Sequence, residues 1–158
     1  MIKKKITYDE IWQLSEKVAE KLIRQNYDVV VSIGRGGLVP ARILAEILDI
    51  KTIDILDAAS YVGTKSGDIY LDNSNISKAY HTTKLQGKNV LIVDDCVTTG
   101  KTIVTAANFI TQCEPAYISN VVLYYNKNLP WNIFNETLTA YGQEYDGKDV
   151  WLVFPWEK

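Results

Sequence analysis

The most constraining feature of this sequence is an apolar run, residues 90–93, that ends directly at two adjacent aspartates, Asp94 and Asp95. A turn rich in Thr follows, and a helical pattern begins at about Gly100. Four consecutive apolar residues predict a strand that is buried on both faces, which is typical of a parallel sheet covered by helices. The same order recurs earlier, where residues 29–33 run into a glycine-rich turn and then a helical stripe. The chain is therefore built from strand–turn–helix units.

These units predict the fold class: an α/β protein with a doubly wound, mostly parallel sheet flanked by helices. Strands are expected at residues 29–33, 52–56, 90–93 and 117–125, and helices at about 7–26, 40–48 and 100–113. The first helix has a capping-box start, with Thr7 followed three residues later by Glu10. The last thirty or so residues are expected to be irregular and aromatic. Ligands of such sheets bind at the carboxyl ends of the strands, where the acid pair falls.

Composition excludes several classes of protein. With 47% hydrophobic residues and a net charge of −2, the chain has the composition of a globular protein without a general affinity for nucleic acid or anionic membranes. No window approaches the ~18 apolar residues of a membrane span. Cys96 and Cys113 lie far apart without metal-ligand spacing, which indicates free thiols in a reducing compartment. We therefore expect a cytoplasmic protein with no nucleic-acid partner.

The Gly-Lys-Thr at residues 100–102 ends like a P-loop, but the rest of that motif is missing. A P-loop needs a glycine five positions before Gly100, where this chain has Asp95, and a carboxylate there would repel phosphate. Two carboxylates instead suit the vicinal hydroxyls of a sugar or a hydrated Mg²⁺. The hydroxyls and N–H groups that follow, at a helix N-terminus, suit a phosphate monoester. The plainer alternative is that the acids only solvate the strand end and the threonines only cap the helix.

Residues 90–102 closely resemble the phosphoribosyl-pyrophosphate (PRPP) signature of the type I phosphoribosyltransferases: a hydrophobic strand, two acids, a variable pair and Thr-Gly-x-Thr. "SIGRGGLVPA", residues 32–41, resembles the family's pyrophosphate loop. "YYNK" (124–127) and "VWLVFPWE" (150–157) resemble the base-binding hood of the short xanthine–guanine and hypoxanthine enzymes. The resemblance covers most of the chain. It implies a single domain, residues 1–158, with a core at about 1–125 and a C-terminal hood at about 126–158.

The resemblance also implies a role for individual residues. Pyrophosphate contacts are expected from Gly34, Arg35, Gly36 and Gly37, with a non-proline cis peptide at Gly34–Arg35. Asp94 and Asp95 are expected to bind the ribose hydroxyls and a metal ion. Contacts to PRPP and its 5′-phosphate are expected from Asp94, Asp95, Val97, Thr98, Thr99, Gly100, Lys101 and Thr102. Base contacts are expected from Lys127, Trp151, Leu152 and Glu157. The residues expected to act in catalysis are Asp94, Asp95, Thr98, Ser60 and Tyr61.

The implied reaction transfers the 5-phosphoribosyl group of PRPP to a 6-oxopurine, namely guanine, xanthine or hypoxanthine, in nucleotide salvage. The products are a nucleoside 5′-monophosphate and pyrophosphate. The implied cofactor is Mg²⁺, and the implied assembly is a homodimer or homotetramer. Ser60 and Tyr61 resemble the start of a flexible catalytic loop, and the polar residues 60–84 are expected to close over the site.

One position departs from the family's pattern. The 6-oxopurine enzymes usually carry an aspartate where this chain has Thr98, and that acid is held to accept the purine N7 proton. A hydroxyl can hydrogen-bond N7 but is far too weakly basic to hold its proton near neutral pH. Two alternatives therefore stay open: a catalytically weak PRPP- or nucleotide-binding regulator, and a phosphoribosyltransferase for another base such as orotate or adenine. His81, the single histidine, is expected to be exposed rather than catalytic.

Overall fold

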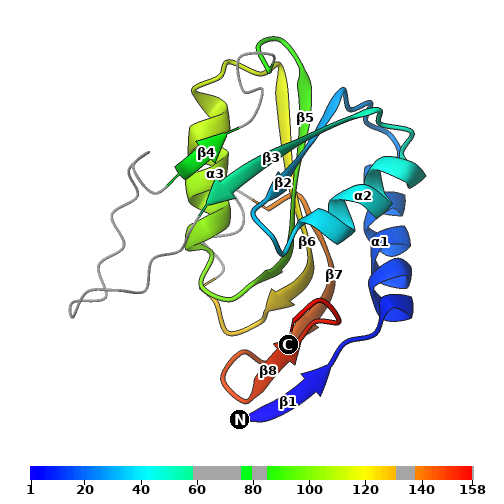
Figure 1. The fold of residues 1–158 in the computed structure, drawn as a ribbon, viewed down its shortest axis with the longest axis vertical. Helices are drawn as coiled ribbons and strands as arrows, with labels where there is room; N and C mark the ends of the chain where they lie inside the picture. Colours follow the sequence, from blue (N-terminus) through cyan, green and yellow to red (C-terminus); the bar gives the residue numbers. More distant parts are fainter. Residues whose placement is uncertain (59–75, 80–84, 131–137, 158) are drawn as a thin grey trace, which may run out of the picture.

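Six strands form one sheet in the order β4-β3-β2-β5-β6-β7 in the computed structural model, which describes residues 1–58, 76–79, 85–130 and 138–157 (Figure 1). Every neighbouring pair is parallel except β3–β4, which is antiparallel. The strands are β2 (Val29–Ile33), β3 (Thr52–Ala58), β4 (Ile76–Ala79), β5 (Asn89–Val97), β6 (Tyr117–Asn126) and β7 (Ala140–Tyr145). The predicted α/β class with a mostly parallel sheet is confirmed.

The described residues form three helices, which cover both faces of this sheet (Figure 1). They are α1 (Tyr8–Leu22), α2 (Leu38–Ile47) and α3 (Lys101–Thr111). Alternate residues of β5 point to opposite faces: Leu91 packs in one cluster with α1 and α2, and Ile92 packs in the other with α3. This two-sided burial is why residues 90–93 read as an unbroken apolar run. No helix among the described residues is long and apolar enough to cross a membrane.

Helix α1 starts at the predicted capping box but ends earlier than predicted. The Thr7 hydroxyl accepts a hydrogen bond from the Glu10 N–H at 3.2 Å, and the Glu10 carboxylate accepts one from the Thr7 N–H at 2.9 Å. The helix ends at Leu22, whereas the sequence predicted an end near Asn26. Leu22 is the last buried residue of the stripe, and Ile23 is 75% exposed. Without an apolar contact to stabilise another turn, the helix stops there.

The prediction that the last thirty residues are irregular was wrong. Strand β7 extends the main sheet beside β6, and β8 (Val150–Val153) pairs in parallel with β1 (Ile2–Lys5) in a separate two-stranded sheet. This small sheet brings the two ends of the chain side by side (Figure 1). Both β1 and β8 have four residues, and they pair with each other from opposite ends of the chain. Short strands with such distant partners leave little local signal in the sequence.

The expected cis peptide at Gly34–Arg35 was also wrong, because no peptide bond among the described residues is cis. Gly34 instead has a φ of 46°, in the region that a glycine enters without a Cβ clash. Its N–H donates a hydrogen bond to the Leu56 carbonyl at 2.6 Å. The chain therefore turns sharply after β2 on a left-handed glycine with ordinary trans geometry.

Thr7→Ala tests whether the capping box stabilises the fold. Loss of the hydroxyl leaves the Glu10 N–H without its acceptor, so the free energy of unfolding should fall by about 1 kcal/mol in urea denaturation. Gln13→Ala, on the exposed face of the same helix, is the control and should leave stability within about 0.5 kcal/mol of wild type. Equal stability of the two variants would contradict the assignment.

Candidate active site

The predicted anion-binding turn and the acid pair meet at the carboxyl ends of two neighbouring parallel strands. β2 pairs with β5 through residue Ser32 opposite Val93, so the turn after β2 lies next to Asp94 and Asp95. The sequence placed these aspartates after the strand, but β5 continues to Val97 and pairs with β6 beyond them. The acids are thus fixed by strand hydrogen bonds rather than carried on a loop.

The glycines of the turn let it pack directly against Asp95. A Cβ placed on Gly36 would lie 2.5 Å from Asp95 Oδ2, closer than any side chain can approach. A Cβ on Gly37 would overlap the Val93 carbonyl oxygen and would lie 2.9 Å from the Ile33 carbonyl oxygen. Gly36 and Gly37 are therefore required by close packing, and Arg35 between them and Gly34 is exposed. The structure brings together all the residues predicted for pyrophosphate binding and both predicted acids.

The two carboxyl groups occupy an electrostatically costly position. Burial raises the pKa of Asp94 well above its ordinary value, and the neighbouring charge of Asp95 raises it further. Burial likewise raises the pKa of Asp95, and the Glu157 carboxylate adds to that rise. The Asp95 N–H donates to Asp94 Oδ1 at 2.9 Å, and the Cys96 N–H donates to Asp95 Oδ1 at 2.6 Å. Two buried acids that repel each other favour a site for a cation or for hydroxyl donors.

A second turn, residues 98–100, leads from β5 into helix α3. Gly100 precedes the first helical residue with a φ of 81°, and no side chain caps the helix. The side chains of Thr98 and Thr99 are exposed, whereas Lys101 and Thr102 are partly buried. The Lys101 N–H donates to the Thr99 hydroxyl at 3.4 Å. The N–H groups at the start of the helix and the two exposed hydroxyls together form a surface suited to phosphate. The Val97 side chain is buried in the α3 core, so the predicted contact from Val97 would have to come from its backbone.

The predicted base-binding residues lie on the hood, which consists of the residues from Asn126 onward. Trp151 on β8 is 55% exposed, while Leu152 beside it is buried, so Leu152 offers only its backbone. The other two aromatic residues within 150–157, Phe154 and Trp156, stack on each other at 5.0 Å and pack against the core. Among residues 150–157, Trp151 is thus the aromatic residue whose side chain is exposed. The Glu157 carboxylate accepts a hydrogen bond from the Phe154 N–H at 2.9 Å.

The hood is tied to the second turn by residues that the sequence analysis did not single out. The buried Asn126 donates from its side-chain amide to the Thr98 carbonyl at 3.0 Å. The Tyr145 hydroxyl lies 3.3 Å from the Thr98 hydroxyl and also donates to the Val97 carbonyl. Lys127 forms an ion pair with Asp146 at 3.1 Å. An Asn at the end of a buried strand is the single signal that the sequence offered for this network.

Some predicted positions cannot be compared with the structure. Ser60, Tyr61 and His81, and most of the expected closing loop at 60–84, lie outside the described residues. Strand β4 is the part of that loop that is described. Within the described ranges no group of three or more His, Cys, Asp or Glu side chains is placed to hold a metal, so Asp94 and Asp95 remain a pair.

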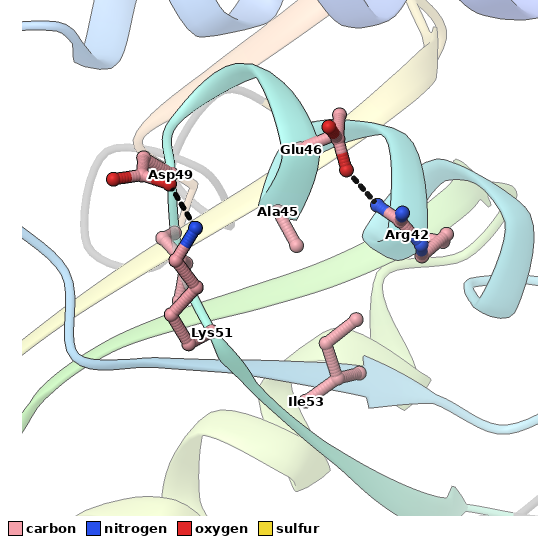
Figure 2. A pocket seen from close by; sticks show the side chains of 7 residues that line it. Arg42, Ala45, Glu46, Asp49, Lys51 and Ile53 are labelled. Carbon is pink, nitrogen blue, oxygen red and sulfur yellow. Dashed lines mark hydrogen bonds and ion pairs between the residues drawn. The ribbon is translucent and has the colours of Figure 1, made fainter.

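A hollow of about 280 Å³ lies elsewhere, between the end of α2 and the start of β3. Figure 2 shows its charged residues in two local ion pairs, Arg42 with Glu46 along α2 and Lys51 with Asp49 in the connection to β3. The hollow lies at the amino ends of the parallel strands, whereas Asp94 and Asp95 lie toward their carboxyl ends. None of the predicted site residues lines it.

Comparison with known proteins agrees with this geometry. Residues 2–131 match the phosphoribosyl transferase domain family. The chain belongs to this family. The xanthine-guanine phosphoribosyltransferase of Roseobacter denitrificans is 31% identical over 158 residues, which cover 96% of this chain and 84% of that one.

Solved structures support the same assignment. The purine phosphoribosyltransferase of Pyrococcus horikoshii superimposes with a TM-score of 0.78 at 28% identity, over 100% of this phosphoribosyltransferase and 95% of that chain. A Neisseria gonorrhoeae protein with bound ppGpp superimposes with a TM-score of 0.76 at 26% identity, over 100% and 92% of the two chains. The type I phosphoribosyltransferase resemblance and fold predicted from the sequence are confirmed.

Asp94→Asn should stabilise this phosphoribosyltransferase at neutral pH. The amide keeps the acceptor for the Asp95 N–H but removes a buried charge that Asp95 repels. Because the pKa of Asp94 is raised by folding, wild-type stability falls as the pH rises above the unfolded-state value of about 4. The gain should therefore be about 1 kcal/mol at pH 7 and should vanish below about pH 4.

Denaturation of the variant and wild type across this pH range measures the gain. Asp149→Asn, which removes the charge of an exposed aspartate, is the control and should show no pH-dependent gain. An Asp94→Asn variant less stable than wild type at pH 7 would contradict the electrostatic account.

Proposed function

We propose that this phosphoribosyltransferase transfers the 5-phosphoribosyl group of PRPP to a 6-oxopurine, giving a nucleoside 5′-monophosphate and pyrophosphate in purine salvage. The observation that carries the proposal is the packing of the glycine turn, residues 34–37, on Asp95, next to the phosphate-suited turn at 98–100. We assign these surfaces, in order, to the pyrophosphate, the ribose and the 5′-phosphate of one PRPP molecule. The names of the Roseobacter and Pyrococcus relatives support a purine as the acceptor.

Each part of PRPP has its own set of proposed contacts. The backbone of the turn at 34–37 and the Arg35 guanidinium bind the pyrophosphate group. Asp94 and Asp95 accept hydrogen bonds from the ribose hydroxyls. The N–H groups and hydroxyls of Thr98, Thr99, Gly100, Lys101 and Thr102 bind the 5′-phosphate, together with the backbone of Val97.

The base-binding contacts come from the hood. Trp151 stacks on the purine, and the Lys127 ammonium donates to the 6-oxo group. The Leu152 backbone and Glu157 contact the base near position 2. Ser60 and Tyr61, which lie outside the described residues, keep their predicted role in catalysis, where the site must exclude water that would compete for the ribose carbon.

Mg²⁺ fits the acid pair as a cofactor. Hard cations take carboxylate oxygens together with substrate phosphates, and Mg²⁺ often uses only one or two protein carboxylates. Asp95 and Asp94 would hold it, since they lie next to each other on β5 and neither forms an ion pair with a Lys or Arg of the described residues. When bound, Mg²⁺ neutralises negative charge on the departing pyrophosphate.

The reaction breaks the bond between C1 of the ribose and a pyrophosphate oxygen and forms one between C1 and a purine ring nitrogen. The chain positions the two reactants and supplies backbone donors to the leaving group. The purine also loses a ring proton, which passes to water because the Thr98 hydroxyl is too weakly basic to take it. Thr98 can hydrogen-bond the ring nitrogen, and the Tyr145 hydroxyl beside it orients the Thr98 hydroxyl.

Pyrophosphate release from PRPP and Mg²⁺ tests the proposal directly. The assay uses guanine, xanthine, hypoxanthine, adenine and orotate in parallel, and the proposal expects release with one or more of the first three. Release with adenine or orotate alone would refute the base assignment. If no base leads to pyrophosphate release while PRPP still binds tightly, the proposed transferase activity would be refuted and a regulatory role favoured.

A nucleotide-binding regulator is the second candidate. This chain has Thr98 at the position where the 6-oxopurine enzymes usually have an aspartate. The structurally similar Neisseria gonorrhoeae protein has ppGpp bound, which shows that a related fold holds a guanine nucleotide. Binding of ppGpp to this chain in the absence of turnover would favour this candidate. The cytoplasmic location and the dimeric or tetrameric assembly remain predictions, which fractionation and sedimentation would test.

Thr98→Asp should raise turnover with hypoxanthine or guanine by roughly 10-fold or more, because it restores a carboxylate that can take the ring proton. The measurement is kcat at saturating PRPP. Thr99→Asp, which adds the same charge one residue away, is the control and should lower activity by repelling the 5′-phosphate. No change or a loss in Thr98→Asp would contradict the role given to position 98.

A further inference from the structure

The Asp146 carboxylate uses its two oxygens for different partners. Oδ1 accepts hydrogen bonds from the Asn128 side-chain amide at 2.6 Å and from the Lys148 N–H at 3.1 Å. Oδ2 lies 3.1 Å from the Lys127 ammonium. Hydrogen bonds from Asn128 and Lys127 and from the Lys148 backbone lower the pKa of Asp146 to about 2. Asp146 is therefore charged at any physiological pH and is too weak a base to take the purine proton.

The partners of Oδ1 are themselves fixed. The Asn126 side-chain oxygen accepts hydrogen bonds from the Asn128 N–H at 3.1 Å and from the Gly147 N–H at 3.1 Å. Asn126 is 7% exposed, and a Cβ on Gly147 would overlap its amide group. Asn126 also donates to the Thr98 carbonyl. A continuous network therefore runs from Thr98 through Asn126 and Asn128 to Asp146.

Lys127 is the mobile member of the ion pair. Its side chain is 52% exposed and its long stem has many rotamers, whereas the Asp146 side chain is 29% exposed and held by two donors. An ion pair this exposed contributes little to stability. Its main physical effect is therefore to restrict where the lysine ammonium lies.

We propose that Asp146 is a positioning residue for base recognition, which holds the Lys127 ammonium in place to donate to the 6-oxo group of the purine. This inference rests on the proposed function. The network through Asn126 fixes that ammonium relative to Thr98 and thus relative to the ribose phosphate. A lysine already in place loses less side-chain freedom when the base binds.

Asp146→Asn separates this role from a structural one. The amide keeps an oxygen at the Oδ1 position for Asn128 and Lys148, and places an NH₂ group where Oδ2 attracts Lys127. Asp149→Asn, three residues away in the same segment, is the matched control, since it removes the same charge from an exposed aspartate outside the network. Kinetics are measured with the best purine of the panel, together with Tm.

The expected result is a KM for the purine about 10-fold higher in Asp146→Asn, with the KM for PRPP and the Tm unchanged, and wild-type values throughout in Asp149→Asn. Lys127→Ala should show a similar rise, and adding Asp146→Asn to it should have no further effect, because the aspartate acts through the lysine.

Three outcomes would overturn the inference while the proposed function stands. The first is an unchanged KM for the purine in Asp146→Asn. The second is a lower KM, which would mean that the ion pair with Asp146 keeps Lys127 away from the purine. The third is that the effects of the two substitutions add. Failure of wild type to release pyrophosphate with any 6-oxopurine would instead refute the proposed function, and the inference with it.

Discussion

The close approach of the glycine turn to Asp95 is the constraint on which the rest of the site depends. Parallel pairing places the ends of β2 and β5 side by side, and the missing side chain of Gly36 lets the turn lie on the carboxylate. Proximity of an anion-binding turn to two acids is unfavourable unless a ligand carries both an anion and hydroxyls, or a cation lies between them. The proposed ligand, PRPP with Mg²⁺, satisfies both conditions and would offset the electrostatic cost that burial and Asp95 impose on the Asp94 carboxylate.

A second physical link joins the phosphate side of the site to the hood. Asn126 and Tyr145 hold the backbone of the turn at Thr98, and the same Asn126 organises the segment that carries Lys127 and Asp146. A buried amide that is hydrogen-bonded on both its nitrogen and its oxygen is a rigid element, so the backbone at Thr98 and the backbone that carries Lys127 are held relative to each other. The residues proposed for base recognition and for binding of the ribose phosphate thus share one network.

The sequence predicted the parts of this structure that are encoded by contiguous residues. The run at 90–93 signals a buried strand and the Thr-Gly turn signals a helix start, and both were confirmed. The acid pair was predicted to follow the strand, whereas β5 continues through it to Val97. Strands β1 and β8 were missed because their pairing joins opposite ends of the chain. Asp146 was missed for a similar reason, since its role depends on the tertiary contacts of Asn126 rather than on a local pattern.

Calorimetric titration of PRPP into the chain with and without Mg²⁺, in the absence of any base, tests the central claim most directly. The account predicts one PRPP per chain, bound tightly only with Mg²⁺, and at least 10-fold weaker binding in Gly36→Ala, whose methyl group would displace Asp95. A folded Gly36→Ala variant that binds PRPP as tightly as wild type, or a PRPP affinity that is the same with and without Mg²⁺, would contradict this claim.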